Sequence, residues 1–286
     1  MLPRQHRRAG RRPAVAGIFR PGRAVCPACC RHGHFRKGGS AVILSVKPLG
    51  DAAVTVRLGD VIHPDVHRRV RGFCHHLEKN APPGVVEWVP TYGSVTVFYQ
   101  PHVIRYEELA KRLADLAADL DRVHLPPARL VVLPTVYGGE WGPDLSFVAE
   151  HNGLSPEEVI RLHSGRDYLV YMMGFVPGFP YLGGMSREIA APRLERPRSR
   201  IPAGSVGIAG NQTGVYPLET PGGWRLIGRT PVRLYDPCRE EPILLRMGDR
   251  LRFEPVGEEE YREIEERVRR GTYTLEIREY TGGEEA

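Results

Sequence analysis

Glycine-rich segments in the second half of the sequence combine the residue types best suited to hold a small ligand. The first is residues 174–182, where the stiff side chains Phe175, Pro177, Phe179 and Tyr181 alternate with glycine. Glycine lets a ligand approach the backbone closely, and aromatic rings supply apolar walls. The same pattern also suits an aromatic loop that fills the end of a barrel, so ligand binding and packing stay open as alternatives.

Arginines follow directly in residues 187–200, which hold five Arg and two Glu. Guanidinium groups bind phosphate or carboxylate through paired hydrogen bonds, and Arg193 and Arg198 are the candidates for this role. Arginine in a loop is commonly just solvated. Here Pro192 and Pro197 restrict the loop, which favours a fixed arrangement.

Two further segments, residues 201–217 and 220–231, complete the set. The former has four glycines separated by small side chains, a pattern that can present successive N–H groups to an anion, although no Gly-Lys-Ser/Thr follows as in a P-loop. In the latter, Trp224 offers a stacking face and Arg229 a cation, unless Trp224 is simply buried in a sheet corner. We find no Ser–His–Asp order, HExxH or paired-cysteine motif, so no self-contained hydrolase is visible.

A first domain over residues 42–126 positions none of these segments. Alternating apolar residues predict strands over 43–50, 52–59, 85–90 and 94–100, and apolar stripes predict helices over 60–80 and 105–122. This order indicates an α+β sandwich with helices on one side of a small antiparallel sheet. Four histidines on the first helix (His63, His67, His75 and His76) are interpreted as solvated, because no carboxylate or thiol completes a metal site.

A second domain over residues 127–256 carries all four segments. A strand over 130–137 leads to helices over 144–152 and 155–163, the latter beginning with the capping pattern Ser155-Pro156-x-Glu158. The glycine- and proline-rich residues after it predict the short strands of a β-barrel, closed by strands over 243–246 and 250–255. Residues 257–286 predict a charged helix and a disordered tail.

Charge is unevenly placed along the 286 residues, whose net charge is +6. Residues 1–41 hold ten Lys or Arg and no acidic residue, and the remainder holds 30 basic and 34 acidic residues, a net of −4. We therefore expect no nucleic-acid partner. No apolar run is long enough for a membrane span, and isolated cysteines favour a reducing compartment, the cytoplasm.

The leader, residues 1–41, predicts disorder from its composition. Cys26, Cys29 and Cys30 suggest a metal knuckle, but no second ligand pair follows. A basic arm that touches nucleic acid or anionic lipid is another alternative. We favour a third, that the leader is untranslated, because Lys37-Gly38-Gly39 can be encoded by a ribosome-binding sequence upstream of a GUG start at Val42.

Taken together, the glycine-rich strings identify a resemblance to the family of 5-oxoprolinase B subunits, also called allophanate hydrolase subunit 1. The matching strings are GFVPGFPYL at 174–182, Pro-Arg at 192–193 and 197–198, IPAGSVGIAG at 201–210, QTG at 212–214, YP at 216–217, PGGW at 221–224 and IGRTP at 227–231. The resemblance covers about residues 43–256 and leaves the leader outside.

This resemblance implies a small N-terminal α/β domain followed by a cyclophilin-like β-barrel. It implies a cytoplasmic protein that works with an A-type and a related C-type subunit to open the lactam of 5-oxoproline to glutamate at the expense of ATP with Mg²⁺, and that is inactive alone. Arg193, Arg198 and Arg229 would supply catalytic positive charge, and Glu219 or Asp236 could hold Mg²⁺. The residues expected to bind substrate are Phe175, Pro177, Phe179, Tyr181, Gly204, Ser205, Gln212, Thr213, Tyr216, Gly222, Gly223, Trp224 and Thr230.

Two other functions remain open within the same resemblance. Relatives include an inhibitor of a sensor histidine kinase and part of the carboxyltransferase region of urea carboxylase. The chain could therefore be a regulatory binding protein or a carboxyltransferase-type component that acts on urea or allophanate. A fold of the cyclophilin type does not by itself indicate prolyl isomerase activity.

Overall fold

The computed structural model describes residues 34–35, 42–118, 120 and 123–282. The hypotheses on the leader lie almost wholly outside these residues, as does most of the tail expected to be disordered. Within the described part, β1 (His34–Phe35) pairs antiparallel with β2 (Val42–Ile43).

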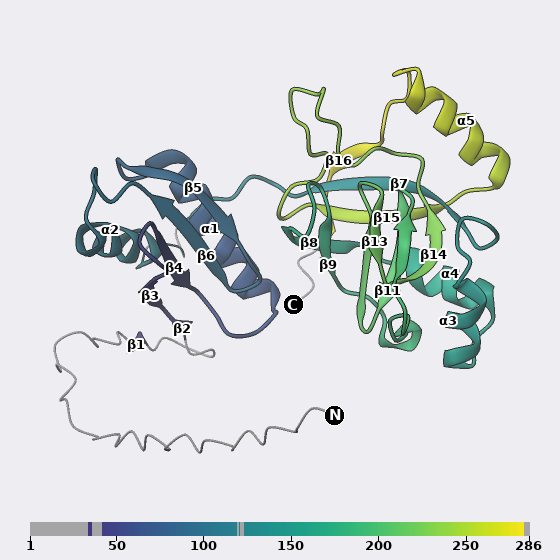
Figure 1. The fold of residues 1–286 in the computed structure, drawn as a ribbon, viewed down its shortest axis with the longest axis horizontal. Coiled ribbons are helices and arrows are strands. Elements are labelled where there is room, and N and C mark those ends of the chain that lie inside the picture. The colour runs from purple at the N-terminus through teal and green to yellow at the C-terminus, as the bar shows by residue number, and fades with distance from the viewer. Residues whose placement is uncertain (1–33, 36–41, 119, 121–122, 283–286) are drawn as a thin grey trace, which may run out of the picture. The chain divides into compact units, whose positions relative to one another are not determined.

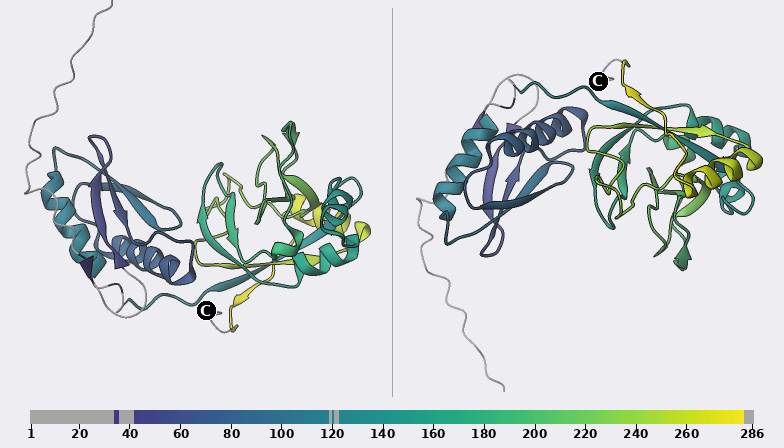
Figure 2. Two further views of the ribbon diagram at one scale, coloured as in Figure 1. Left: turned by 90° about the horizontal axis from the view of Figure 1, so that it is seen from below. Right: turned by 90° about the horizontal axis from the view of Figure 1, so that it is seen from above.

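A four-stranded antiparallel sheet in the order β3-β4-β6-β5 forms the first half of the described chain (Figure 1). Its strands are β3 (Ser45–Pro48), β4 (Ala53–Arg57), β5 (Val85–Pro90) and β6 (Ser94–Tyr99). Helices α1 (Pro64–Asn80) and α2 (Tyr106–Ala118) pack on this sheet (Figure 2). Alternate residues of β4 and β6, such as Val54 and Val97, are buried together with Phe73 of α1 and Leu109 of α2. Because side chains of a strand alternate between faces, these residues mark the face that the helices cover.

The second half of the chain forms a nearly closed, barrel-like sheet of eight strands. Seven follow the order β12-β11-β14-β7-β15-β8-β9, with β16 added to β7, and the end strands β12 and β9 lie next to each other. The strands are β7 (Arg129–Tyr137), β8 (Tyr168–Met173), β9 (Pro180–Gly183), β11 (Ser205–Ala209), β12 (Gln212–Val215), β14 (Arg225–Arg229), β15 (Arg250–Pro255) and β16 (Ile277–Glu279). A separate two-stranded sheet pairs β10 (Arg198–Ile201) with β13 (Thr220–Gly222).

Helices α3 (Leu145–Asn152) and α4 (Pro156–Ser164) pack against the core of the barrel-like sheet. The capping box at the start of α4 is confirmed, since the Ser155 hydroxyl accepts from the Glu158 amide at 3.2 Å and the Glu158 carboxylate accepts from the Ser155 amide at 2.8 Å. A short 3₁₀ helix, η2 (Arg187–Ile189), follows β9.

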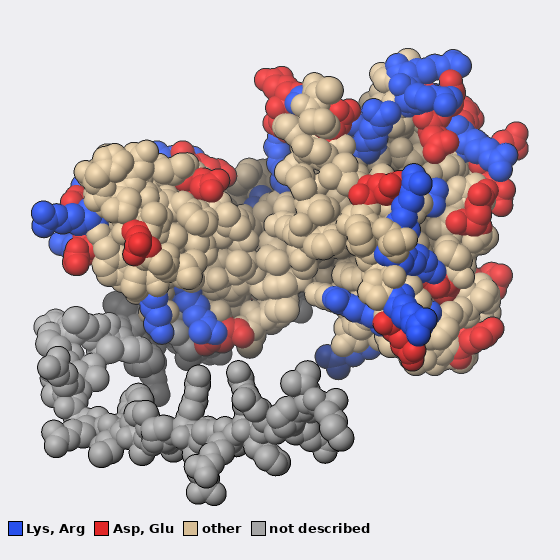
Figure 3. Space-filling view, viewed as in Figure 1, with Lys and Arg blue, Asp and Glu red and all other residues tan. Residues whose placement is uncertain are grey.

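The last helix, α5 (Glu258–Arg269), contacts the rest of the second half through an aromatic pair. The ring of Tyr261 lies 5.7 Å from that of Trp141, and both residues are buried. Charges of both signs gather over the region of α5 (Figure 3), which agrees with its ion pairs, such as that between Arg270 and Glu266. We interpret the outer face of α5 as a solvated surface.

The α+β class and the barrel-like sheet are as the sequence predicted, with two exceptions in the second half. The strand expected over 243–246 is wrong: only a single bridge between Ile243 and Tyr235 forms there. The sequence also missed β16, which pairs with β7 from within the segment expected to be helix and tail. No helix among the described residues is long and apolar enough to cross a membrane.

Candidate functional site

A tight turn between β8 and β9 presents the first glycine-rich segment. The amide of Gly174 donates to the carbonyl of Phe179, and the amide of Phe179 donates to the carbonyl of Val176, both at 3.1 Å. Phe175 has a φ of 65° and is the only described residue other than glycine with positive φ, while its side chain is 63% exposed. A left-handed conformation costs a side-chain-bearing residue about 1–2 kcal/mol, so the fold holds this ring outward against a conformational penalty.

Aromatic rings pack edge to face behind this turn and form an aromatic cluster. Phe179 is its centre, with ring centroids 5.4–5.6 Å from those of Tyr181, Tyr216, Trp224 and Phe175. Such offset and edge-to-face pairs add stability beyond the apolar area that they bury. Phe179, Tyr216 and Trp224 are buried, so their rings serve the core of this cluster and only Phe175 offers a fully open apolar surface.

Gly214 explains why strand β12 can lie beneath this cluster. A Cβ atom at Gly214 would lie 3.1 Å from Phe179 and 3.2 Å from Trp224, closer than ordinary van der Waals contact. A larger residue would push both rings away from the strand. The glycine is therefore required by close ring approach rather than by its backbone angles.

Arg198 is fixed beside the aromatic cluster by the buried carboxylate of Asp144. The guanidinium makes two contacts of 2.9 Å with the two carboxylate oxygens of Asp144 and also donates to the carbonyl of Trp224 at 3.4 Å. Asp144 accepts in addition from the Leu226 amide at 2.7 Å. The charge of Arg198 is thus already balanced within the chain, which favours a positioning role over direct anion binding.

Arg225 lies on the other side of the same carboxylate. Its guanidinium is 3.9 Å from Asp144, donates to the Pro192 carbonyl at 3.2 Å and stacks 3.5 Å from the ring centroid of Phe147. These contacts hold the start of residues 192–198, the arginine-rich loop. Sequence reasoning missed both residues. Asp144 looked like an ordinary helix start, and within residues 220–231 only Trp224 and Arg229 were singled out, not Arg225.

Arg193 differs from both because it has no carboxylate partner among the described residues. Its guanidinium lies 6.0 Å from the centroid of the Trp224 ring, and the residue is exposed. Burial raises the pKa of Tyr216 close by, so that phenol stays neutral next to the cation. Of the predicted cations, Arg193 is the one free to accept an anionic group from outside.

Arg229 lies apart from the other predicted cations. It stands four residues along β14 from Arg225, roughly 13 Å at the usual rise of a strand. There it faces α5, where burial raises the pKa of Tyr261 to about 12 and Arg229 acts in the opposite direction. Its buried Nε has no hydrogen-bond partner in the described part of the chain.

The glycines predicted to bind substrate support the backbone around the cluster. Gly204 has a φ of 81°, and a Cβ there would lie 2.2 Å from the Thr230 carbonyl. A Cβ at Gly222 would lie 2.6 Å from the Tyr216 hydroxyl, and the carbonyl of Gly223 accepts from the Leu194 amide at 2.8 Å. These positions shape the site, and contact with a substrate at them stays a prediction.

Most of the polar residues that were predicted to bind substrate form hydrogen bonds within the protein. The Thr213 hydroxyl donates to the Gly207 carbonyl at 3.1 Å and hydrogen-bonds His163 at 2.8 Å. The Thr230 hydroxyl accepts from the Val232 amide, and Gln212 donates to the Tyr92 hydroxyl at 3.1 Å. Ser205 is buried, with a hydroxyl that has no hydrogen-bond partner among the described residues. Pro177 is exposed in the turn beside Phe175.

Comparisons with known proteins find a family model and relatives that match most of the chain. A family model described as carboxyltransferase domain, subdomain C and D, matches residues 44–245. A curated relative, the B subunit of 5-oxoprolinase from Bacillus subtilis, is 46% identical over 77% of this chain and 96% of its own length. A relative of the same name from Escherichia coli O157:H7 is 43% identical over 73% and 95%. The solved structure of Kluyveromyces lactis urea carboxylase resembles this chain in fold alone. The TM-score is 0.68, with 21% identity over 86% of this chain and 24% of the carboxylase chain.

Proposed function

Because the chain belongs to the family of carboxyltransferase domains, subdomain C and D, we propose that it is the B subunit of an ATP-dependent 5-oxoprolinase. The observation that carries this proposal is the 46% identity to a 5-oxoprolinase B subunit over nearly all of that protein's length. Two further relatives of that name, at 43% and 40% identity, extend the same likeness.

The carboxyltransferase alternative has weaker support. A yeast urea amidolyase is 25% identical, and the match covers 14% of that protein. A likeness of this degree supports a common fold, and a fold serves many activities. The kinase-inhibitor alternative stays a prediction that the gene neighbourhood can test, since a lone gene beside a histidine kinase would favour it.

In the proposed reaction, one water adds across the lactam C–N bond of 5-oxoproline and yields the carboxylate and amine of glutamate. A second water converts ATP to ADP and phosphate. ATP, when bound to the complex with Mg²⁺, supplies the phosphoryl group that makes the lactam, a poor electrophile, reactive. The complex must therefore balance considerable negative charge during turnover.

Arg193 is the residue of this chain best placed to balance such charge. It is exposed, lies beside the face of Trp224, and has no carboxylate partner among the described residues. Arg198 is held in place by Asp144, and Phe175 and Pro177 supply the open apolar side. Glu219 contacts Arg200 at 2.7 Å, and Asp236 lies near Arg233 and Arg239, so both of the carboxylates first considered for Mg²⁺ are balanced by arginines.

We further propose that the A-type and C-type subunits complete the site and that this chain alone is inactive. The outward position of Phe175 and Arg193 supports this, because both present their groups to the surface rather than to an enclosed cavity. The need for ATP favours a cytoplasmic complex.

The test is ATP-dependent glutamate release from 5-oxoproline by the purified A-type and C-type subunits, with and without this chain. We expect release only when all three are present. Arg193→Ala should lower kcat/KM by roughly tenfold or more, in the range seen when a donor to developing charge is removed. Arg112→Ala, which removes an exposed arginine of α2 paired with Glu108, is the matched control and should leave turnover unchanged. A folded three-subunit complex that releases no glutamate would sink the proposal.

A further inference from the structure

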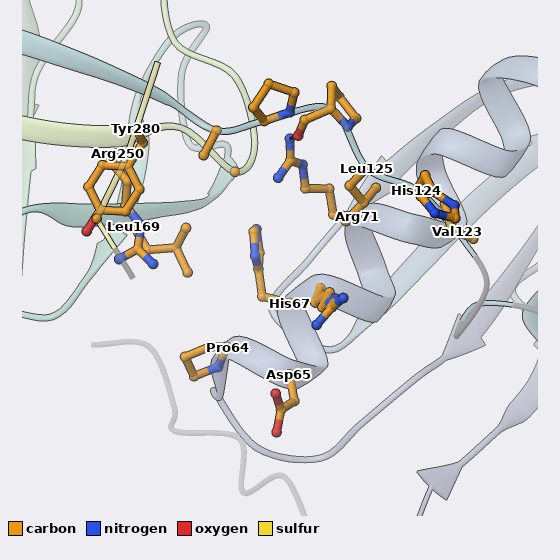
Figure 4. Close-up of a pocket in the computed structure, with 16 residues that line it drawn as sticks. Pro64, Asp65, His67, Arg71, Val123, His124, Leu125, Leu169, Arg250 and Tyr280 are labelled. Atoms are coloured by element: carbon orange, nitrogen blue, oxygen red, sulfur yellow. Dashed lines mark hydrogen bonds between the residues drawn. The ribbon is translucent and has the colours of Figure 1, made fainter. Parts of the chain in front are cut away.

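A pocket of about 570 Å³ lies away from the candidate site and shares no residue with it. Its walls come from the first turns of α1, the connection over residues 123–128, the starts of β8 and β15, and the chain around Tyr280. Figure 4 shows His67 between Arg71 on one side and Arg250 on the other.

His67 is the least expected residue in this pocket. Its side chain is only 4% exposed, which corrects the expectation of a solvated helix residue. Its ring packs edge to face on Tyr171 with centroids 5.0 Å apart, and the backbone of Val170 and Tyr171 lies close to it. Its Nε2 is nevertheless buried without a hydrogen-bond partner of normal geometry among the described residues. A buried polar atom without a partner destabilises the fold, so a ligand that accepts from this nitrogen would recover that loss.

Arg71 is fixed against the backbone rather than against an acid. It donates to the Pro126 carbonyl at 2.8 Å. A Cβ atom at Gly248 would lie 2.6 Å from its Nε, so only glycine lets the guanidinium lie where it does. Burial lowers the pKa of Arg71, which reflects a cation that the protein desolvates without a contact ion pair.

Arg250 is held in a similar way on the other side of the pocket. Its guanidinium stacks at 5.1 Å from the centroid of the Tyr280 ring, a contact that orients the cation without neutralising it. No carboxylate lies within ion-pair distance of Arg250 in the part of the chain that the structure describes. Both arginines thus line the pocket on either side of His67 without a contact ion pair among the described residues.

Nearby acids are occupied or lie in solvent. Asp249 is bound by Arg129 through two contacts of 3.0 and 2.6 Å and accepts from the Arg246 amide. Asp65 lines the pocket, but its side chain is 83% exposed and pairs with His63. The charged or titratable groups of the pocket around His67 are Asp65, Arg68 and Arg71 on α1, His124 in the connection over residues 123–128, Tyr171 on β8, Arg250 at the start of β15, and Tyr280. Asp249 and Glu78 act on Arg71 from farther away.

We propose that this pocket binds a small oxyanion, a carboxylate or phosphate group, between Arg71 and Arg250, with His67 as a third donor. Guanidinium groups match both oxyanions through paired hydrogen bonds. The volume suits a small molecule that carries the anion rather than a macromolecule. The site goes beyond the proposed function, because it needs neither the lactam nor the other two subunits.

Binding should also change the protonation of His67. Without a ligand, burial and then Arg71 and Arg250 lower the pKa of His67 to about 4, against a smaller opposing effect of the backbone at Tyr171 and Val170, so the ring is neutral. An anion between the arginines reverses the sign of the local charge and favours the imidazolium, which can donate from both nitrogens. The ligand should therefore bring a proton with it when it binds near pH 5.

The experiment is calorimetric titration of the full chain with sodium sulfate and, separately, with sodium acetate. Sulfate serves as the tetrahedral probe because it keeps its charge between about pH 5 and 8, where histidine titrates. We expect saturable binding of at least one probe, and the better probe tells whether the natural ligand carries a phosphate or a carboxylate. Arg71→Ala and Arg250→Ala should each weaken binding about tenfold, and Arg112→Ala should not.

A second measurement needs no variant that risks misfolding. Histidine NMR of the unaltered chain should show the His67 titration move up by at least one pH unit at saturating probe. Binding that does not saturate with either probe would overturn the proposal. The proposal would also be overturned if Arg71→Ala and Arg250→Ala bound the probe as tightly as the unaltered chain, or if the titration of His67 did not change with the probe.

Discussion

The aromatic cluster and the pocket beside His67 both hold arginines against aromatic rings, but they balance charge differently. In the cluster, Arg198 shares two contacts with the buried carboxylate of Asp144. In the pocket, Arg71 and Arg250 meet a carbonyl and a tyrosine ring, and no acid lies within ion-pair distance in the described part of the chain.

This contrast separates two uses of the same side chain. An arginine with its own buried carboxylate holds the fold together, because its charge is satisfied before any ligand arrives. An arginine that is oriented without being neutralised is ready to accept an anion from outside. By this criterion Arg193 belongs with Arg71 and Arg250, although it lies beside the aromatic cluster.

The largest effect should follow from removing the carboxylate of the cluster. Asp144→Ala leaves Arg198 without its partner and the Leu226 amide without its acceptor. Breaking a buried ion pair in this way costs about 3–5 kcal/mol of unfolding free energy. Urea unfolding followed by circular dichroism measures the change.

The matched control is the surface pair of Arg112 and Glu108 on α2, 2.7 Å apart and about half exposed. Glu108→Ala should change the unfolding free energy by less than about 0.5 kcal/mol. Equal losses in Asp144→Ala and Glu108→Ala would show that Asp144 does not anchor Arg198 in solution.

Most of the helices and strands could be predicted from local sequence patterns. The apolar stripes of α1 and α2 and the capping box of α4 depend on neighbours within a few residues, so they could be found from the sequence. Residues 243–246 were predicted as a strand because they form a short apolar run. In the structure Ile243 makes only a single bridge to Tyr235, and no ladder extends it among the described residues. All three residues of β16 are exposed, so the sequence there lacks the alternation of apolar and polar residues that would predict a strand paired with β7.

The site was predictable only in part, for a related reason. Motifs pointed to Phe179, Trp224 and Arg198, but nothing local links Arg198 to Asp144, 54 residues earlier in the chain. His67 and Arg250 are likewise far apart in sequence, and the pocket arises only when both halves of the chain are folded. Interactions of high sequence separation depend on tertiary structure that a pattern search does not contain.

A smaller effect should separate the two buried histidines as the pH falls. Burial lowers the pKa of His67 to about 4 and that of His163 to about 3, below the unfolded value near 6.5. Between these values the unfolded chain binds protons at both histidines and the folded chain does not. The free energy of unfolding therefore keeps its full value above pH 6.5 and declines as the pH falls toward the lower pKa values. His67 alone should account for about 2–3 kcal/mol of the loss between pH 7 and 4.5.

The measurement is urea unfolding at several pH values for the unaltered chain and His67→Leu. We expect a shallower loss of stability in His67→Leu, because leucine takes up no proton on unfolding. The substitution should cost little at pH 8, since the Nε2 of His67 has no hydrogen-bond partner among the described residues. His163→Leu makes the matched comparison: it should destabilise the chain even at pH 8, since His163 hydrogen-bonds the hydroxyls of Tyr137 and Thr213, both at 2.8 Å. Parallel pH curves for His67→Leu and the unaltered chain would contradict a neutral, buried His67.

The smallest effect on stability is expected at Phe175, where function rather than folding should explain the residue. Phe175→Asn suits the left-handed conformation, and the relief of that penalty should offset the lost contact with Phe179 to within about 1 kcal/mol. In the three-subunit assay, however, glutamate release should fall about tenfold, because the exposed ring no longer meets substrate or partner. Phe175→Tyr keeps the ring and should retain most of the activity. Full activity in Phe175→Asn would mean that the outward ring serves neither role, and the proposed reaction would then rely on Arg193 beside the aromatic cluster.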